Sequence, residues 1–389
     1  MSQPPVVRVN RKAAARAAAG HPWIFASDVL DQGAAAPGDT VTVVDPSGRP
    51  LGTADYSASS QICLRLLSRR VESVDRAWLD KKLRAALELR ERLVQNSEAC
   101  RLVHSEADGL PGLILDRYGP SLVLQTLSQA MDRRLPDLVA CVQDLLSPEA
   151  IIARNDAPVR SKESLPLEVK VLAGSPPALA QFRMNGLTLH ADLLQGQKTG
   201  VYLDQRENYL AAARYARGRV LDCFTSSGGF ALHLAPRAEF VEAVDSSAPA
   251  LRLAELNRQA NARDNIHLLE ADVFDLLPGY TSSGRKFSMV VLDPPAFAKS
   301  RGALSGAARG YKEINVRALK LLEPGGVLVT CSCSHHLSEA MFLEILAEAS
   351  LDAGRPLRVL ERRTQAQDHP ILLTVPETHY LKCLILQAL

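Results

Sequence analysis

The feature that most constrains this chain is the alternation of apolar strands with helices over its second half. From about residue 185, stretches with helical spacing separate short apolar runs at 220–224, 240–245, 266–272, 287–293 and 326–330. Strands that are apolar on both faces and joined by helices form a parallel sheet covered on both sides. The apolar run at 380–386 adds one more buried strand. We therefore predict an α/β fold with a mostly parallel, doubly wound sheet.

The first 180 residues predict two smaller segments. Residues 1 to about 72 contain short alternating runs such as 40–44 and 61–66 with turn residues between them, which is typical of a small β-rich module. A helix is predicted at 76–95, followed by two strands between 113 and 125 and by a further helix and strand up to about 172. The proline-containing stretch 174–177 indicates a boundary or linker.

Composition indicates an ordinary globular protein in the cytoplasm. The 389 residues are 47% hydrophobic and 23% charged, and no apolar run approaches the roughly 18 to 20 residues of a membrane-spanning helix. The seven cysteines lack the spacing of a disulfide framework and indicate reduced thiols. With a net charge of only +2, any RNA-binding surface must be a local patch.

The N-terminal segment is the more basic part of the chain. Up to Arg70 it has eight basic and five acidic residues, with Arg65, Arg69 and Arg70 clustered at its end. Such a cluster can hold phosphates, and a solvated basic surface is equally plausible. The arginine-rich start also suits a transit peptide, but the strand-like alternation at 6–9 favours folded structure instead.

Four acids follow the predicted strands in order. Asp222, Asp245, Asp272 and Asp293 stand at the carboxyl ends of the first four strands, where doubly wound sheets bind their ligands. Asp245 lies 23 residues beyond Asp222, which suits an acid that binds ribose hydroxyls, and a glycine pair closes the first turn. Any one of these acids alone is more often a helix cap. The first turn lacks the G-x-G-x-x-G pattern of a nicotinamide dehydrogenase, so the set favours a methyltransferase.

The fourth strand is followed by Asp293-Pro294-Pro295 and then Phe297. Two prolines fix the backbone beyond the strand, which leaves Asp293 and carbonyl groups to meet a base edge and Phe297 to stack on it. The alternative interpretation is a loop that is merely stiffened by proline.

The fifth strand ends in Thr-Cys-Ser-Cys-Ser-His-His at 330–336. If the fourth and fifth strands are neighbours, this turn faces Asp293. A thiolate is suited to reversible addition to C6 of cytosine, which makes C5 nucleophilic. Two alternatives are a metal cluster, for which the spacing is too tight, and chemically inert cysteines in a turn.

These motifs together resemble the RlmI-type class I methyltransferases, which make 5-methylcytosine in large-subunit ribosomal RNA. The resemblance covers essentially the whole chain and rests on the stretches 21–25, 106–118 (EADGLPGLILDRY), 196–208 (GQKTGVYLDQREN), 222–230, 293–299 (DPPAFAK), 309–313 (RGYKE), 330–336 and 375–382 (VPETHYLK). It implies a PUA-like RNA-binding domain at 1–73, an α+β middle domain at 74–180 and a Rossmann-like methyltransferase domain with a seven-stranded sheet at 181–389.

The resemblance also implies the site. Cys333, rather than Cys331, aligns with the nucleophile, and Asp293 stabilises protonation at N3. The segment 198–206 would close over the S-adenosylmethionine pocket, whose expected contacts are Lys198, Tyr202, Arg206, Asp222, Phe224, Thr225, Ser227, Gly228, Asp245, Ser246, Asp272, Val273 and Asp293. The expected contacts to RNA are Pro294, Pro295, Phe297, Lys299, Arg309, Tyr311 and Lys312. No metal is expected.

Two departures from the wider class of RNA cytosine-C5 methyltransferases stand out. Pro295 occupies the place of a second cysteine that assists product release, so the base for that step is unassigned. The turn at 225–227 lacks an aromatic residue before the glycines.

We expect a cytosine-C5 methyltransferase of ribosomal RNA, without membrane association, with a homodimer as the oligomer to test. The alternatives are methylation of an exocyclic nitrogen (guanine N2 or adenine N6) and a non-catalytic ribosome-assembly factor.

Overall fold

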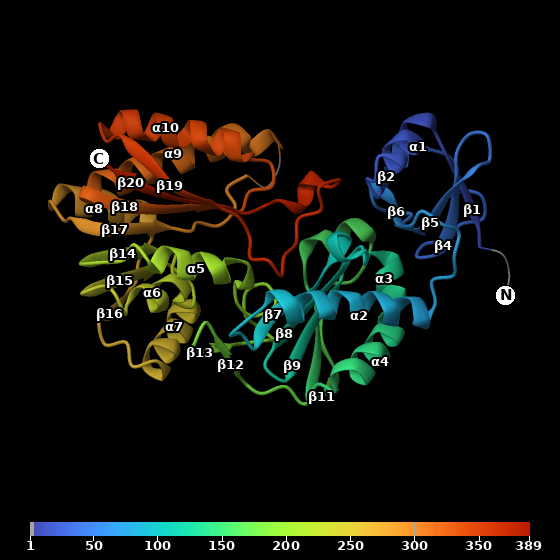
Figure 1. Ribbon diagram of the computed structural model, residues 1–389, viewed down its shortest axis with the longest axis horizontal. Helices are drawn as coiled ribbons and strands as arrows, with labels where there is room; N and C mark the ends of the chain where they lie inside the picture. The colour runs from blue at the N-terminus through green and yellow to red at the C-terminus, as the bar shows by residue number, and fades with distance from the viewer. Residues whose placement is uncertain (1–3, 299–300) are drawn as a thin grey trace. The chain divides into compact units, whose positions relative to one another are not determined.

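The computed structural model describes residues 4–298 and 301–389, which form two compact units (Figure 1). The first unit comprises Met1–Arg183, Ala191–Val201 and Gln367–Thr378. The second comprises Met184–His190, Tyr202–Ala366 and His379–Leu389. Both units are therefore discontinuous in sequence. Among the described residues, no helix has both the length and the apolar character needed to span a membrane.

The first unit begins with a six-stranded sheet, in the order β2-β6-β5-β4-β1-β3. Helix α1 (Arg11–Ala18) starts after Asn10, whose side chain accepts a hydrogen bond from the Ala13 amide at 2.8 Å. Alternating valines and a leucine from the strands fill the core beneath this helix. The strands predicted at 6–9, 40–44 and 61–66 are confirmed. The strand bounds are β1 (Val6–Val9), β2 (Trp23–Phe25), β3 (Val29–Asp31), β4 (Thr40–Val44), β5 (Pro50–Tyr56) and β6 (Ile62–Ser68).

A five-stranded sheet, in the order β11-β10-β9-β8-β7, forms the rest of this unit. The helix predicted at 76–95 is confirmed as α2 (Arg76–Leu93), which begins after the capping carboxylate of Asp75. The other elements are α3 (Gln129–Arg133), α4 (Leu135–Leu146), β7 (Ala99–His104), β8 (Leu113–Tyr118), β9 (Ser121–Thr126), β10 (Ala150–Asn155) and β11 (Glu168–Gly174). The domain boundaries expected near 73 and 180 remain predictions.

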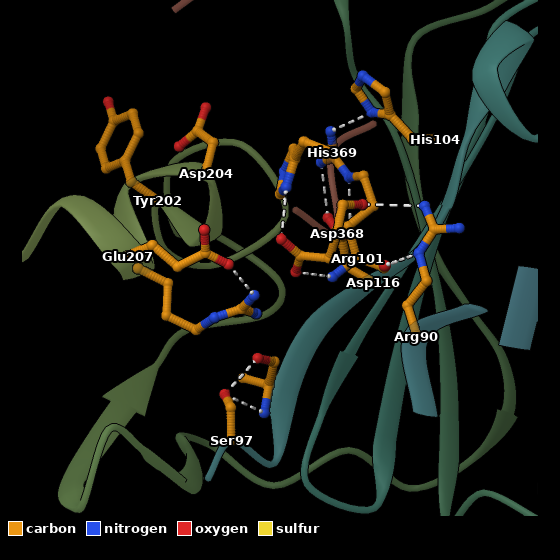
Figure 2. A network of polar contacts seen from close by, with 12 residues as sticks. Arg90, Ser97, Arg101, His104, Asp116, Tyr202, Asp204, Glu207, Asp368 and His369 are labelled. Carbon is orange, nitrogen blue, oxygen red and sulfur yellow. Dashed lines mark hydrogen bonds and ion pairs between the residues drawn. The ribbon is translucent and has the colours of Figure 1, made fainter. Parts of the chain in front are cut away.

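A buried polar network holds two later segments in the first unit. The carboxylate of Asp368 accepts a hydrogen bond from the Arg101 amide at 2.9 Å, and its backbone carbonyl accepts one from Arg90 at 2.9 Å (Figure 2). Thr199 donates to Asp116, the ion-pair partner of Arg101, at 2.6 Å. These contacts explain why Ala191–Val201 and Gln367–Thr378 pack in the first unit, although the strands on either side of them belong to the second.

The second unit is built on a seven-stranded sheet in the order β16-β15-β14-β17-β18-β20-β19. All its strands are parallel except β20, which runs antiparallel to both of its neighbours. Its strands are β14 (Arg219–Cys223), β15 (Phe240–Asp245), β16 (Ile266–Glu270), β17 (Phe287–Leu292), β18 (Leu322–Ser332), β19 (Leu357–Arg363) and β20 (Lys382–Ala388). A separate two-stranded sheet pairs β12 (Ala180–Met184) with β13 (Leu187–Ala191).

Helices cover both faces of the seven-stranded sheet, as predicted. One face carries α8, α9 and α10, and the other carries α5, α6 and α7 (Figure 1). The bounds are α5 (Arg206–Ala213), α6 (Gly229–Leu234), α7 (Ala248–Ala260), α8 (Val273–Ser282), α9 (Leu304–Leu321) and α10 (Glu339–Ala353). The predicted α/β fold class is confirmed.

Three predicted strands end differently in the structure. The strand expected at 380–386 is β20 (Lys382–Ala388), because its pairing with β18 begins only at Lys382. The strand expected at 266–272 stops at Glu270, because Asp272 caps helix α8 instead of extending the sheet. The strand expected at 326–330 is longer, running from Leu322 to Ser332, because β20 pairs with it up to its last residue.

Candidate active site

The sheet register brings the predicted motifs to one edge. Cys223 of β14 pairs with Leu292 of β17, which pairs with Thr330 of β18. The carboxyl ends of these three strands therefore lie at one edge of the sheet, although β18 continues for two more residues, to Ser332. The expectation that the fourth and fifth strands are neighbours is confirmed, so Asp293 and the cysteine turn leave the sheet from adjacent strands.

Asp222 is fully buried at the start of the first turn. Its Oδ2 accepts hydrogen bonds from the Thr225 hydroxyl at 2.6 Å and from the Ala231 amide at 2.9 Å. Its Oδ1 is buried without a hydrogen-bond partner. Burial raises the pKa of Asp222 to about 7, and the carboxylates of Asp293 and Asp245 act in the same direction. A buried acceptor in this state favours a ligand that brings a donor.

The first turn is held in a strained backbone conformation. Phe224, Ser226 and Gly228 have φ values of +63°, +51° and +86°, and only glycine adopts such values without steric cost. Gly229 is needed for packing, because a Cβ there would lie 2.5 Å from the hydroxyl oxygen of Tyr209. The second glycine of the pair therefore makes room for Tyr209 inside the protein.

Asp245 and Asp272 differ in what they contact. Both oxygens of Asp245 accept backbone hydrogen bonds, from the Ser226 amide at 2.8 Å and from the Ser247 amide at 2.9 Å, so this carboxylate joins the first turn to the second. Asp272 is exposed and accepts from the Phe274 amide at 2.7 Å as the cap of α8. Of the other expected contacts, Thr225, Gly228 and Val273 are buried, Phe224 and Ser227 are partly buried, and Ser246 is exposed.

A short 3₁₀ turn, η4 (Leu203–Gln205), leads into helix α5 and contacts Asp293. The Gln205 amide donates to Asp293 Oδ1 at 3.1 Å and its carbonyl accepts from Asn208 at 2.7 Å. Burial, then the charge of Asp293, raises the pKa of the Tyr202 phenol well above its ordinary value. The charge of Asp293 thus acts on the Tyr202 phenol, and the cofactor contact expected of Tyr202 remains a prediction. Arg206 is buried and pairs with Glu207 at 3.2 Å.

The Asp-Pro-Pro loop rests on helix α9. Pro294 is buried and Pro295 is exposed, while the partly buried ring of Phe297 lies 4.6 Å from the ring of Tyr311. The Ala298 amide donates to the Ser334 hydroxyl at 3.2 Å, which joins this loop to the cysteine turn.

One of the expected RNA contacts, Tyr311, is wrong in this structure, while the contact expected of Lys312 remains a prediction. Tyr311 has no exposed surface, and its hydroxyl hydrogen-bonds with those of Ser332 and Ser334 at 2.9 and 3.1 Å, because it packs beneath Phe297. Lys312 forms ion pairs with two acidic residues of α10, Glu348 at 3.1 Å and Asp352 at 3.0 Å. Its charge is therefore balanced within the protein.

The remaining expected contacts stay predictions. Arg309 is exposed on α9. Lys198 belongs to the first unit, apart from the other expected cofactor contacts, and Lys299 lies outside the described residues.

The two cysteines of the turn have different environments. Cys331 is fully buried in β18, and burial together with neighbouring Cys383 raises the pKa of its thiol well above the ordinary value. Cys333 is partly exposed and its sulfur lies 4.0 Å from the Pro294 carbonyl oxygen. All seven cysteines lie in the described part of the chain, and the other six are buried. Accessibility therefore favours Cys333 as the reactive thiol.

Lys382 was not anticipated as part of this site. It opens strand β20, is 2% exposed, and donates from Nζ to the Ser334 carbonyl at 2.7 Å and to the Tyr380 carbonyl at 2.8 Å. Burial lowers its pKa to about 8, against the opposing effect of the Cys333 and Glu339 charges. The sequence feature that could have pointed to Lys382 is a lysine within an otherwise apolar predicted strand.

The basic cluster predicted at the end of the first sheet is partly used inside the first unit. Arg65 is buried and pairs with Glu163 at 2.7 Å, and Arg69 donates to the carbonyl of Ala17 at 3.1 Å. Arg70 is exposed.

In the described residues there is no group of three or more histidine, cysteine or acidic side chains arranged to hold a metal ion.

Comparison with known proteins identifies the family. A family model described as a PUA-like domain matches residues 7–69, and one described as an S-adenosylmethionine-dependent methyltransferase matches residues 160–386. Ribosomal RNA large subunit methyltransferase I of Erwinia tasmaniensis is 42% identical over 371 residues, which cover 93% of this chain and 94% of the relative. The protein of that name from Klebsiella pneumoniae strain 342 is also 42% identical, with 93% of each chain covered. This chain belongs to the ribosomal RNA large subunit methyltransferase I family.

The resemblance inferred from the motifs is thereby confirmed, and S-adenosylmethionine is the cofactor of this member of the ribosomal RNA large subunit methyltransferase I family. Among solved structures, the fold resembles that of SMU.776, a methyltransferase crystallised with SAH. The TM-score is 0.86 with 98% of this chain and 100% of the other covered, and the identity of 18% limits the comparison to the fold.

The first turn fits this cofactor on its own geometry. Asp222 Oδ1 is a buried acceptor that lacks a donor, and S-adenosylmethionine carries an ammonium group and ribose hydroxyls that can donate. Gly228 at φ +86° presents backbone without a side chain at the start of α6, where ligands approach the sheet edge.

Proposed function

We propose that this protein methylates C5 of a cytosine in large-subunit ribosomal RNA, with Cys333 as the covalent nucleophile. The observation that carries the proposal is the position of Cys333, a partly exposed thiol 4.0 Å from the Pro294 carbonyl of the Asp-Pro-Pro loop. The relatives' name, ribosomal RNA large subunit methyltransferase I, supports the class of substrate, and the PUA-like match supports RNA binding.

The cofactor is held, in this proposal, by the first turn and the strand-end acids. Asp222 supplies an acceptor for the ammonium group, and Asp245 supplies one for the ribose hydroxyls. Tyr202, Arg206 and the other predicted contacts that belong to the second unit close the pocket around it. When bound, S-adenosylmethionine supplies an electrophilic methyl group.

The protein's own residues carry the remaining steps. The target cytosine leaves its stack and enters the site, where Phe297 offers a stacking face. The Cys333 thiolate adds to C6 while N3 takes a proton from solvent, and the N3–H group so formed donates a hydrogen bond to Asp293. The adduct is an enamine whose electron pair is available at C5. C5 takes the methyl group. A base, which is not assigned, then removes the C5 proton. The electron pair of that bond re-forms the C5–C6 double bond and expels the Cys333 thiolate, and N3 returns its proton to solvent.

The decisive experiment combines two readouts on one variant. Cys333→Ala should bind S-adenosylhomocysteine in calorimetry like the wild type and form no 5-methylcytosine in nucleoside mass spectrometry. RNA containing 5-fluorocytosine should trap a covalent adduct with the wild type but not with Cys333→Ala, because fluorine at C5 blocks the final proton removal. Cys331→Ala is the matched control and should retain product formation, since that thiol is buried in β18.

Three results would redirect the proposal. If Cys333→Ala still forms 5-methylcytosine, Cys333 is not the nucleophile. An N-methylated guanine or adenine as wild-type product establishes the exocyclic-nitrogen alternative, which needs no cysteine. Absence of S-adenosylmethionine binding would favour a ribosome-assembly factor. The cytoplasmic location and the homodimer remain predictions, to be measured by fractionation and by light scattering.

A further inference from the structure

A buried amine lies directly behind the turn that carries Cys333. Strand β20 pairs with β18 in a register that places Lys382 opposite Ser332, and one residue later the chain reaches Cys333. The Lys382 Nζ donates to the carbonyl of Ser334, the residue after Cys333, at 2.7 Å. The amine is thus fixed to the backbone on the far side of the turn.

The position is costly for a lysine, which is seldom buried without a carboxylate partner. Lys382 is 2% exposed, and its Nζ donates to the neutral carbonyls of Ser334 and Tyr380. Two ionisable groups act on its charge across the fold, Cys333 from the turn after β18 and Glu339 from the first turn of α10, and both favour the ammonium form. In the same turn, the ring of His335 lies 5.4 Å from that of Tyr380.

We propose that Lys382 is a positioning residue that activates Cys333, its buried ammonium group stabilising the thiolate while its hydrogen bond to Ser334 fixes the turn. The attraction between two opposite charges is mutual, so the thiolate that favours the ammonium form of Lys382 is equally favoured by it. The low dielectric around a buried amine strengthens this attraction. A cation beside a cysteine is a common means of raising thiolate content.

The proton balance leaves Lys382 unchanged through the reaction. The Cys333 thiol gives its proton to solvent before RNA binds, and Lys382 keeps its three protons. When the thiolate adds to C6, sulfur loses its negative charge and protonation of N3 keeps the cytosine adduct neutral. The negative charge returns to sulfur when the thiolate is expelled. Lys382 therefore stabilises the state before addition and the state after release, and is not the base that takes the C5 proton.

Thiol alkylation tests this without RNA or cofactor. The full-length protein is treated with iodoacetamide from pH 5.5 to 9.5, and the modification of Cys333 is followed by peptide mass spectrometry, with Cys333→Ser as the blank. Lys382→Met should slow alkylation at pH 7 by about tenfold and move the midpoint of the pH profile upward. Lys382→Arg should restore much of the rate because the cation is kept.

A fourth variant separates charge from structure. Lys382→Gln retains a donor for the Ser334 carbonyl and has no charge, so it should be as slow as Lys382→Met. If Cys333 is alkylated in Lys382→Gln at the wild-type rate, the proposal is overturned. An unchanged pH profile of alkylation in Lys382→Met would overturn it as well. Folding of each variant is checked by S-adenosylhomocysteine binding, and if Lys382→Met fails to fold, the comparison of Lys382→Gln with Lys382→Arg decides.

The inference rests on the proposed function only for its catalytic meaning. If Cys333→Ala still produces 5-methylcytosine, the proposed function fails while the effect of Lys382 on the thiol can still be observed. If alkylation is insensitive to Lys382 but Cys333→Ala is inactive, the proposed function stands and this inference fails.

Discussion

The buried carboxyl of Asp222 makes the stability of the second unit depend on pH in a specific direction. Burial raises its pKa from the ordinary 3.8 to about 7 in the folded protein. Because the folded-state pKa lies above the unfolded one, the contribution to stability is complete below about pH 4 and is lost as the pH rises through about 7. Each pKa unit corresponds to about 1.4 kcal/mol, so the raised pKa of Asp222 changes the free energy of unfolding by about 4 kcal/mol in total.

The comparison is between the wild type and Asp222→Asn in urea unfolding from pH 4 to pH 8. Both tryptophans, Trp23 and Trp78, belong to the first unit, so a circular dichroism transition without a change in tryptophan fluorescence reports on the second. Asparagine does not titrate. The free energy of unfolding of the wild type should therefore fall by about 4 kcal/mol relative to the variant across this range.

The difference in the free energy of unfolding between the wild type and Asp222→Asn is free of the effects of other titrating buried groups, because both proteins share them. One of these is His233, whose pKa burial lowers to about 4, and which acts in the opposite direction. Asp272→Asn is the control, because Asp272 is an exposed helix cap and asparagine caps equally well, so this variant should keep the wild-type slope. Parallel curves for the wild type and Asp222→Asn would refute the reasoning.

Two further predictions concern other buried contacts. Arg90→Met should destabilise the first unit by about 3–5 kcal/mol in tryptophan-monitored unfolding, because it leaves the Asp108 carboxylate buried without its ion-pair partner. Arg84→Met, which breaks an exposed ion pair, should cost far less stability, and equal costs for the two variants would contradict the argument. Gln205→Leu should lower kcat by about 10- to 100-fold with cofactor affinity retained, because Asp293 loses an orienting hydrogen bond. An unchanged kcat in steady-state methylation assays would show that Gln205 has no such role.

Local sequence patterns were sufficient for the fold and for part of the site. The alternation of apolar runs with helical spacing predicted the α/β class, because the side-chain periods of strands and helices are properties of short stretches of chain. The same patterns predicted which acids follow strands, and parallel strands bring such ends to one edge. Asp222 and Asp293 could therefore be assigned to the site from order alone, without any contact being known.

Contacts that join distant parts of the chain were decided only by tertiary structure. The sequence 309–313 gave no indication that Tyr311 is buried or that Lys312 is paired with acids on another helix. Lys382 reaches Ser334 across 48 residues because β20 returns antiparallel beside β18, and the direction of that pairing is not a property of either strand alone. The sequence by itself determined which residues stand at the strand ends, while packing over long separations decided which of them face solvent, which support the turn and which charge lies behind Cys333.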